Sequence, residues 1–395
     1  MFTRRAALTL PLAALATRAG AADIDLRLPG GPSLRPLTRA FPGKGEMILQ
    51  RLVPPLLETP LAAFDTGVIT PNDRFFVRWH WPVPTEIDPA TWRLAVGGAV
   101  TTPLQLSLAE LAKLPQQEVV AVNQCAGNAR GLFEPRVAGA QWGQGAWGNA
   151  RWRGVALKHV LDRAGVAAGA MVVRFAGADT PPVEGAPQFR KALAVDHARD
   201  GEVLVATHMN GEPLPLLNGA PLRLVVPGWY STYWVKALNH IELLPGADDN
   251  FWMAKAYLIP DTPGAHVAPG TKDFPKKPIA AMVPRALITS LTDGDRAPVA
   301  ERLTLRGIAM GGDQGVAKVE ISTDAGATWR NATLGVDIGR YSFRRFEAAI
   351  APVRGPMTIL TRATNSAGAT QPLAPIWNPS GYQRGQVEAT RVEFV

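Results

Sequence analysis

Residues 121–130 read AVNQCAGNAR, and Cys125 within them is the only cysteine in the 395-residue chain. A short apolar run at 119–122 precedes it, and a Gly-Asn pair at 127–128 follows it. Runs of this kind favour strands, whereas Gly and Asn favour loops. We therefore expect Cys125 to lie where a strand ends and a loop begins.

The N-terminal segment, residues 1–21, has the pattern of an export signal. Arg4-Arg5 precede an apolar stretch, and a small-x-small cleavage pattern follows at 19–21. Adjacent arginines predict the twin-arginine route, which exports folded proteins, although a basic, slightly apolar arm is the alternative. No other stretch reaches the ~20 apolar residues that a membrane span needs. We expect a periplasmic bacterial protein without a membrane span, whose mature chain begins near Ala22.

Composition excludes several classes of protein. The formal net charge is +8, and it falls to +5 when the three arginines of residues 1–21 are set aside. No Lys/Arg run interleaved with aromatic residues is present, so we expect no nucleic-acid partner. One cysteine cannot hold an iron–sulfur cluster or attach a c-type haem, so we expect no haem in this chain.

The pattern of apolar residues predicts two domains. Helical periodicity occurs at 106–115, with Ser107 as the N-cap, and at 154–166, among strand-like runs such as EVVAV, MVVRFAG, EVLVATHM and PLRLVVPG. This mixture predicts an α+β domain, and a Pro- and Gly-rich stretch at 259–278 predicts a linker after it. The runs RLTLRGIAM, VAKVEISTD, ATWRNATL and YSFRRFEAAI then predict an Ig-like β-sandwich. The expected units are an N-terminal arm (22–60), a catalytic domain (61–262), a linker (263–280) and a sandwich (281–395).

Several polar residues are candidates for a site around Cys125. Arg78 and His80 lie two apart in an extended stretch, which places both side chains on one face. The six histidines show no standard metal-ligand spacing, and no Gly-x-Ser-x-Gly motif of a hydrolase is present. Any metal bound at Cys125 would therefore take its other ligands from outside the protein. The remaining candidates flank a Gly-containing turn or precede the linker: Arg223, Lys236 and Tyr257.

The segment NQCAGNARGLFEPRVAGAQWGQGAWGNARWRGV (123–155) resembles the cofactor segment of the sulfite oxidase family of molybdenum enzymes. GGDQGVAKVEISTDAGATW (311–329) resembles the family's C-terminal Ig-like dimerisation domain. The resemblance runs from about residue 60 to the end and is greatest to bacterial periplasmic sulfite dehydrogenases. It implies a mixed α/β molybdopterin-binding domain, the sulfite oxidase fold, followed by an Ig-like dimerisation domain and hence a homodimer. The cytochrome b5 domain of animal members is absent from this sequence.

The resemblance implies which residues meet the metal and the substrate. Cys125 would be the single protein ligand to molybdenum, where a thiolate suits a soft, sulfur-rich coordination, and plain molybdopterin would supply the dithiolene ligand. FFVRWHWPVP (75–84) resembles the family's Phe-Val-Arg-Asn-His-x-Pro-Val-Pro motif, which implies that Arg78 binds substrate. Arg130, five residues after the cysteine, matches the second substrate arginine. Tyr257 matches the active-site tyrosine and would act in binding and catalysis.

The same resemblance implies the contacts that hold the cofactor. In the motif at 75–84, Trp79 replaces the commoner Asn, and His80 would contact the cofactor. Asn218 stands where animal members have histidine. The other implied cofactor contacts are Asp179, Arg223, Trp234 and Lys236. Two segments, RRFE (344–347) and GYQRG (381–385), are candidates for a pocket residue from the C-terminal domain.

The implied function is the oxidation of sulfite to sulfate, with electrons passed to a periplasmic c-type cytochrome. Two guanidinium forks, on Arg78 and Arg130, would match a small oxyanion with charge-assisted hydrogen bonds. Three alternatives remain open. The protein could be a sulfane-sulfur dehydrogenase acting on protein-bound sulfur, a periplasmic molybdenum sulfoxide reductase, or an exported β-rich binding module in which Cys125 is inert.

Overall fold

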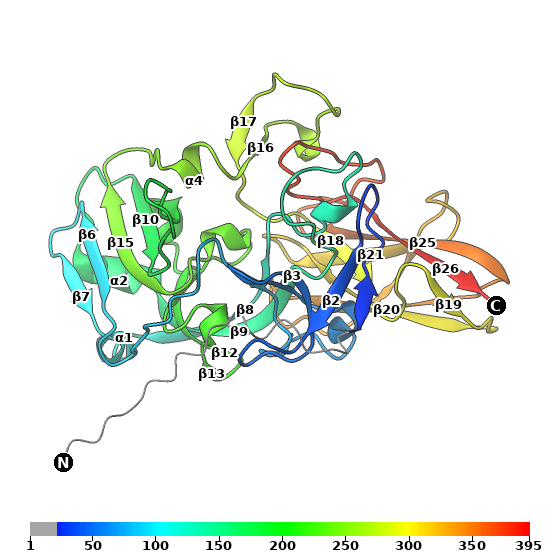
Figure 1. The fold of residues 1–395 in the computed structure, drawn as a ribbon, viewed down its shortest axis with the longest axis horizontal. Helices are drawn as coiled ribbons and strands as arrows, with labels where there is room; N and C mark the ends of the chain where they lie inside the picture. Colours follow the sequence, from blue (N-terminus) through cyan, green and yellow to red (C-terminus); the bar gives the residue numbers. More distant parts are fainter. Residues whose placement is uncertain (1–21) are drawn as a thin grey trace, which may run out of the picture.

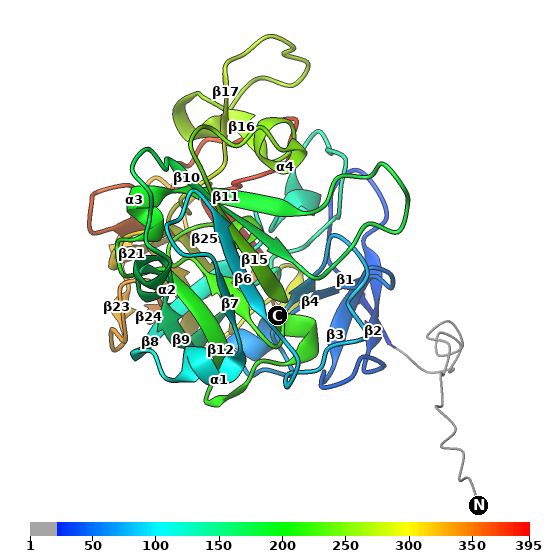
Figure 2. The ribbon, with the colours of Figure 1, turned by 90° about the vertical axis from the view of Figure 1, so that its left-hand side faces the viewer.

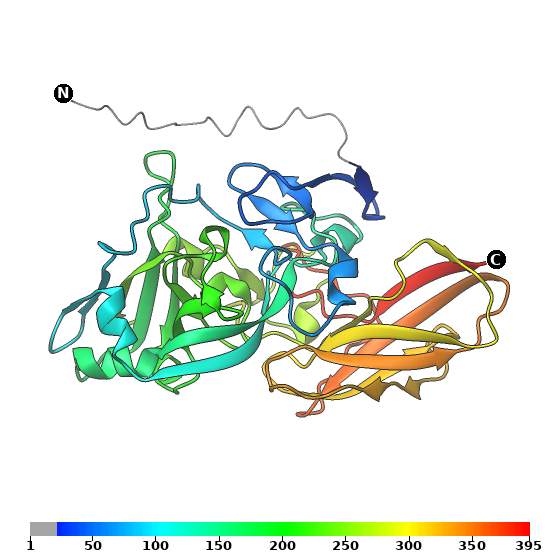
Figure 3. The same cartoon turned by 90° about the horizontal axis from the view of Figure 1, so that it is seen from below.

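The computed structural model describes residues 22–395, so the expected export signal lies outside the described residues. Sheets dominate this part of the chain, and its helices are short. Figures 1 and 3 show two lobes along the long axis, a cyan and green lobe of mixed sheets and a yellow-to-red β-sandwich. The predicted fold class, an α+β domain followed by an Ig-like sandwich, is confirmed. Within residues 22–395 no helix has the length and apolar character that crossing a membrane requires.

The N-terminal arm forms four strands of a five-stranded antiparallel sheet, and the fifth strand, from the start of the catalytic domain, carries Arg78. Its own small core packs Met47 and Leu57 against Val77 and Trp79. The arm therefore fixes the position of the strand that bears the first candidate substrate residue. In order across the sheet, the strands are β1 (Asp23–Asp25), β2 (Leu34–Thr38), β3 (Met47–Arg51), β4 (Leu56–Glu58) and β5 (Val77–Arg78).

The catalytic domain contains one mixed sheet and one antiparallel sheet. One runs in the order β11 (Arg190–Ala194), β10 (Val172–Gly177), β15 (Leu238–Leu244), β6 (Leu94–Gly98), β7 (Leu104–Leu106), with β15 and β6 parallel. The other runs in the order β13 (Glu212–Pro213), β12 (Leu204–Met209), β9 (Trp147–Ala156), β8 (Gln116–Gln124), and β14 (Arg223–Val225) also pairs with β12. Each of the four apolar runs expected here as a strand contributes one: β8, β10, β12 and β14.

The helices are shorter than their sequence patterns predict. α1 (Leu108–Ala112) begins after Ser107, whose hydroxyl accepts a hydrogen bond from the Glu110 N–H in a capping box, as predicted. α2 (Leu157–Ala164) begins three residues later than expected, because Gly154 to Ala156 belong to the ladder of β9 with β12. It ends at Gly165, where φ is +70°. The other helices are α3 (Val195–Ala198), α4 (Phe251–Ala254) and the 3₁₀ turns η2 (Leu61–Phe64), η3 (Arg130–Leu132), η4 (Leu216–Asn218), η5 (Ser231–Tyr233) and η6 (Pro263–Ala265).

The C-terminal sandwich has two sheets. One contains, in spatial order, β18 (Arg285–Ile288), β20 (Leu303–Met310), β24 (Arg344–Ile350) and β23 (Thr333–Leu334). The other contains β19 (Asp295–Ala297), β26 (Glu388–Phe394), β25 (Gly355–Asn365), β21 (Val316–Ser322) and β22 (Arg330–Asn331). The run ATWRNATL, expected as one strand, is divided at Ala332, since β22 pairs in one sheet and β23 in the other.

The stretch between the two domains carries a small strand pair. β16 (Leu258–Pro260) and β17 (Lys276–Pro278) are antiparallel, and the loop between them stands out at the top of Figures 1 and 2. The apolar core continues across this connection. Phe343 of the sandwich packs its ring 4.8 Å from that of Trp147 and 5.9 Å from that of Phe64. The two lobes are thus joined by buried contacts as well as by the chain.

Candidate functional site

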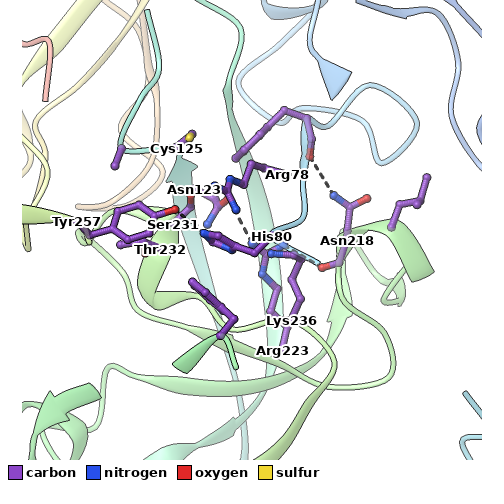
Figure 4. Close-up of a pocket in the computed structure, with 14 residues that line it drawn as sticks. Arg78, His80, Asn123, Cys125, Asn218, Arg223, Ser231, Thr232, Lys236 and Tyr257 are labelled. Atoms are coloured by element: carbon purple, nitrogen blue, oxygen red, sulfur yellow. Dashed lines mark hydrogen bonds between the residues drawn. The ribbon is translucent and has the colours of Figure 1, made fainter. Parts of the chain in front are cut away.

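One cavity collects most of the residues that the sequence singles out. It spans about 440 Å³ and opens to solvent, and Figure 4 shows side chains converging on it from β5, the end of β8 and the segments around β14 and β16. Its lining residues are Phe76, Arg78, His80, Asn123, Cys125, Ala126, Phe189, Leu217, Asn218, Arg223, Ser231, Thr232, Lys236 and Tyr257.

Cys125 directly follows the last residue of β8, where the sequence predicts it. Its N–H donates to the Ala146 carbonyl, and its carbonyl accepts from the Asn128 N–H, each at 2.9 Å. The Asn128 side-chain oxygen accepts in turn from the Ala146 N–H at 2.9 Å. These bonds fix the loop, so the thiol is held at the cavity wall with the residue 7% exposed.

Arg78 and His80 both line the cavity, which confirms the expected shared face. The His80 ring stacks on Phe189 with centroids 3.7 Å apart, and its Nε2 lies 2.5 Å from the Tyr257 hydroxyl. Burial, and then the charge of Arg78, lowers the pKa of His80 well below its usual value. The imidazole is therefore neutral at pH 7. Its Nδ1 has no hydrogen-bond partner within the described chain.

Tyr257 reaches the cavity from a strained backbone. Its φ is +55°, in the left-handed region, which costs a residue other than glycine about 1–3 kcal/mol and is concentrated at functional sites. Burial raises the pKa of the phenol above its ordinary value, so the hydroxyl keeps its proton at neutral pH. The left-handed backbone at Tyr257 thus accompanies a protonated hydroxyl beside His80.

Two cationic side chains, Arg223 and Lys236, form what we call the floor of the cavity. Burial lowers the pKa of Arg223 to about 9. Burial, followed by the charge of Arg223, lowers the pKa of Lys236 to about 7. Burial alone accounts for the shift of Arg223, whereas the charge of Asp179 opposes part of the shift of Lys236. An anionic group bound here would raise the pKa of both groups and would gain affinity from their positive charge.

Unpaired polar atoms test whether a cofactor fits. Buried polar atoms are normally hydrogen-bonded, yet several that belong to cavity-lining residues have no partner in residues 22–395. Most are donors, as a ligand rich in phosphate and ring acceptors requires. Together with the thiol and the cationic floor, they fit a phosphate-bearing molybdopterin. The atoms are Arg78 Nη1, His80 Nδ1, Asn123 Nδ2, Arg223 Nε and Thr232 Oγ1.

Asp179 and Trp234 lie behind the cavity and do not line it. Burial raises the pKa of Asp179 to about 6, opposed by the charge of Lys236. Trp234 is fully buried; its indole N–H donates to the Trp229 carbonyl at 2.9 Å, and Arg223 lies 5.7 Å from its ring. Both residues therefore adjoin the two buried cations, and their direct contact with a cofactor stays a prediction.

Asn218 is held by a lysine that sequence reasoning missed. Lys44, in the N-terminal arm, donates from Nζ to the Asn72 carbonyl at 2.7 Å, the Phe75 carbonyl at 2.9 Å and the Asn218 side-chain oxygen at 2.8 Å. The Asn218 amide donates to the Phe76 carbonyl at 3.3 Å. Asn218 therefore presents a fixed face to the cavity.

Replacing Lys44 by methionine is expected to lower the free energy of unfolding by about 1–3 kcal/mol, because three buried acceptors lose their donor. Cofactor content should fall as well, since Asn218 is released. Chemical denaturation and metal analysis measure the two effects. Lys158→Met, at an exposed helix position, is the control and should change stability by less than about 0.5 kcal/mol. Wild-type stability in Lys44→Met would show that these hydrogen bonds carry no net stabilisation.

Arg130 does not line the cavity. Its Nε donates to the Gly381 carbonyl at 3.2 Å and its Nη2 to the Ser380 carbonyl at 3.3 Å. Its guanidinium lies 4.8 Å from the ring centroid of Tyr382. The structure thus uses this arginine to hold a loop of the C-terminal domain, and its proposed contact with substrate stays a prediction.

That loop packs against residues that line the cavity. The Tyr382 ring stacks on Tyr257 with centroids 5.2 Å apart and planes at 8°. The Gln383 N–H donates to the carbonyl of Ala126, the residue after Cys125, at 3.0 Å. Of the two candidate C-terminal segments, GYQRG therefore reaches the site region.

Lys191, also missed, is a buried cation beside Tyr257. Its Nζ donates to the Trp252 carbonyl at 3.0 Å and lies 4.5 Å and 5.2 Å from the ring centroids of Tyr233 and Tyr257. In the strand RKALA it shares the phase of buried Leu193, and this lysine at an inward position is the signal that could have identified it. Burial lowers its pKa to about 7, against the charge of Asp248.

Lys191 makes stability depend on pH. Its folded-state pKa, about 7, lies below the unfolded value of 10.5, so between these pH values the unfolded state binds more protons. Stability therefore rises with pH across this window. Denaturation of cofactor-free protein should show a larger gain from pH 6.5 to 9.5 in the wild type than in Lys191→Met. Equal gains in the two proteins would mean that Lys191 titrates normally.

Comparison with known proteins gives matches over both domains. An oxidoreductase molybdopterin binding domain matches residues 80–252, and a Mo-co oxidoreductase dimerisation domain matches residues 276–386. The sulfite oxidase of Gallus gallus is 35% identical over 347 residues, which cover 82% of this chain and 73% of that protein. The chain belongs to the sulfite oxidase family of molybdenum enzymes. The resemblance noted in the sequence is thereby confirmed.

Other relatives extend this assignment. Mitochondrial sulfite oxidases of Mus musculus and Homo sapiens are each 34% identical, over 86% and 82% of this chain. The chain spans 64% and 61% of their lengths, less than two thirds. Among solved structures, the crystal structure of the sulfane dehydrogenase SoxCD from Paracoccus pantotrophus is similar, with a TM-score of 0.74 and 25% identity. The match covers 87% of this chain and 85% of that one.

Ten residues were expected to form a sulfite oxidase family site, and the structure brings seven of them to one cavity. These seven are Arg78, His80, Cys125, Asn218, Arg223, Lys236 and Tyr257. The other three, Arg130, Asp179 and Trp234, adjoin that cavity from behind or through a neighbouring loop. The individual roles of all ten stay predictions.

Proposed function

We propose that this protein oxidises sulfite to sulfate at a molybdenum ion bound by molybdopterin and by the thiolate of Cys125. The observation that carries the proposal is the single cavity in which this thiol, Arg78 and a set of buried, unpaired donors converge. Balance requires one oxygen from water and releases two electrons and two protons. We assign the electrons to an external periplasmic c-type cytochrome.

When bound, the cofactor would supply the two-electron redox chemistry. The chain's own residues would bind the cofactor, orient the substrate and hold a proton beside it. Arg223 and Lys236 would hold the phosphate, with His80 Nδ1 and the Asn218 side chain at other edges of the cofactor. The guanidinium of Arg78 would fix the sulfite oxygens and orient the anion, which is the main protein contribution to the rate. The Tyr257 hydroxyl would hold a proton beside the substrate.

Location and assembly are part of the same proposal. Residues 1–21 have the twin-arginine pattern, from which we infer export of the folded protein to the periplasm. The match of residues 276–386 to a dimerisation domain supports a homodimer built through the sandwich.

A second function has a specific observation in its favour. The similarity to the sulfane dehydrogenase spans nearly the whole chain, so the oxidation of protein-bound sulfane sulfur is the alternative activity. Both reactions would use the cavity at Cys125 and differ in the size of the substrate. A small inorganic anion needs only the inner cavity, whereas a carrier protein must dock at its mouth.

The deciding experiment combines metal analysis of the purified protein with assays of cytochrome c or ferricyanide reduction. About one molybdenum per chain and reduction driven by sulfite would establish the proposal. Molybdenum without sulfite activity, but with reduction driven by a sulfane-loaded carrier protein, would establish the alternative. Protein made in a host that synthesises the cofactor but containing no molybdenum would refute both.

A further inference from the structure

A second cavity lies on the far side of Tyr257. It is open to solvent and spans about 620 Å³ between the end of α4, the β16–β17 pair and the loop at 379–382. Tyr257 lines both this outer cavity and the cavity that contains Cys125. A molecule in the outer cavity is therefore separated from the inner one by the wall that Tyr257 forms.

The wall between the cavities contains an aromatic pair, Tyr257 and Tyr382, of which Tyr382 belongs to the loop at 379–382. Tyr382 stacks on Tyr257 and also lines the outer cavity. The Ser380 hydroxyl donates to the Leu258 carbonyl at 2.7 Å, which ties the loop to β16. Passage from the outer cavity to the thiol would require these two stacked rings to shift.

The outer cavity is positively charged. Of its nine lining residues, Lys255 and Lys276 are charged and none is acidic. Both lysines are exposed, and within residues 22–395 neither forms an ion pair. The adjacent Lys277 differs, because its Nζ is bound to the Asp261 carboxylate at 2.8 Å. Neighbouring strand residues point to opposite sides, so Lys276 alone of this pair faces the cavity.

We propose that the outer cavity is a vestibule that binds small oxyanions through Lys255 and Lys276. Flexible, hydrated ammonium groups attract an anion without fixing its orientation, whereas the planar guanidinium of Arg78 orients it. A low-dielectric cleft lined by one sign of charge raises the local concentration of the opposite charge. Sulfite would enter and sulfate would leave through this vestibule. The identity of these two anions rests on the proposed function.

The test measures anion binding and turnover separately. Equilibrium dialysis with radiolabelled sodium sulfate at low ionic strength needs no catalysis, and an Arg78→Met background removes the inner anion contact. The double variant Lys255→Ala/Lys276→Ala should weaken sulfate binding about tenfold. In protein with intact Arg78, it should lower kcat/KM for sulfite about tenfold with kcat unchanged, and it should flatten the salt dependence of kcat/KM. Lys277→Ala removes a neighbouring charge and should match the wild type in every measurement.

The outcomes separate the vestibule from the proposed function. Unchanged sulfate affinity in the double variant would overturn the vestibule, whether or not the protein oxidises sulfite. Lysine-dependent sulfate binding in a protein that does not oxidise sulfite would support the vestibule and refute the proposed function. An equal loss of sulfate binding in Lys277→Ala would show a diffuse surface effect and would also overturn the vestibule.

Discussion

Replacing Cys125 by serine is expected to lower sulfite oxidation by three orders of magnitude or more, equivalent to about 4 kcal/mol. The thiolate is the one soft protein ligand proposed for the metal, and a serine hydroxyl is a hard, weakly acidic donor. Because the pterin would still be held by Arg223 and Lys236, the organic part of the cofactor should be retained better than the activity. Metal analysis, pterin fluorescence after acid release and ferricyanide reduction measure these quantities separately.

Two controls make the Cys125 result specific. Serine nearly matches cysteine in size and the backbone bonds of residue 125 remain, so the thermal midpoint should change by only a few degrees. Asn128→Ala, which removes the bond to the Ala146 N–H, reports on distortion of the same loop without loss of the thiol. Wild-type turnover in Cys125→Ser would remove the metal ligand from the proposal and return the thiol to an inert core role.

The second large effect is expected at Arg78. Arg78→Lys should lower kcat/KM for sulfite about 100-fold, or about 2.7 kcal/mol, because lysine keeps the charge but loses the planar fork. Arg78→Met removes the charge too and should cost about another factor of ten. Steady-state kinetics at several sulfite concentrations divide the effect between KM and kcat.

The Arg78 variants must retain the cofactor for this interpretation to hold. Molybdenum content should equal that of the wild type, since the floor of the cavity is unchanged. Arg93→Met is the matched control: Arg93 lies on the surface, with its guanidinium bonded to backbone carbonyls, and its loss should leave kinetics unchanged. If Arg78→Lys turned over sulfite at the wild-type rate, charge alone would suffice and orientation by the fork would be excluded.

Sequence patterns of a few residues predicted the position of Cys125 and the shared face of Arg78 and His80. Cys125 at the end of β8 follows from an apolar run before a Gly-Asn pair, and the shared face of Arg78 and His80 follows from strand periodicity. Ser107 at the start of α1 follows from the capping pattern. Each of these depends on residues only a few positions apart.

The features that the sequence did not predict depend on contacts between distant segments. Lys44 and Asn218 are 174 positions apart, and no local pattern links them. The segment that contains Tyr382 was one of two candidates for the site. The stack of Tyr382 on Tyr257 could not be predicted, because it requires the sandwich to be placed against the first domain. The sequence pattern predicts that the helix begins at Gly154, whereas α2 begins three residues later. Pairing of Gly154 to Ala156 with β12 overrides the helical periodicity there.

The backbone bond from Gln383 to Ala126, with the packing of Phe343 on Trp147, has a consequence for cooperativity. The dimerisation domain supplies part of the scaffold beside the proposed metal ligand. The stability of one domain therefore depends on contacts with the other, although the sequence divides them. Catalytic and dimerisation domains share part of one apolar core, and we expect each to stabilise the other. A substitution in the sandwich, distant from any substrate contact, is therefore expected to lower enzyme activity. Natural selection on the sandwich then acts in part on catalysis.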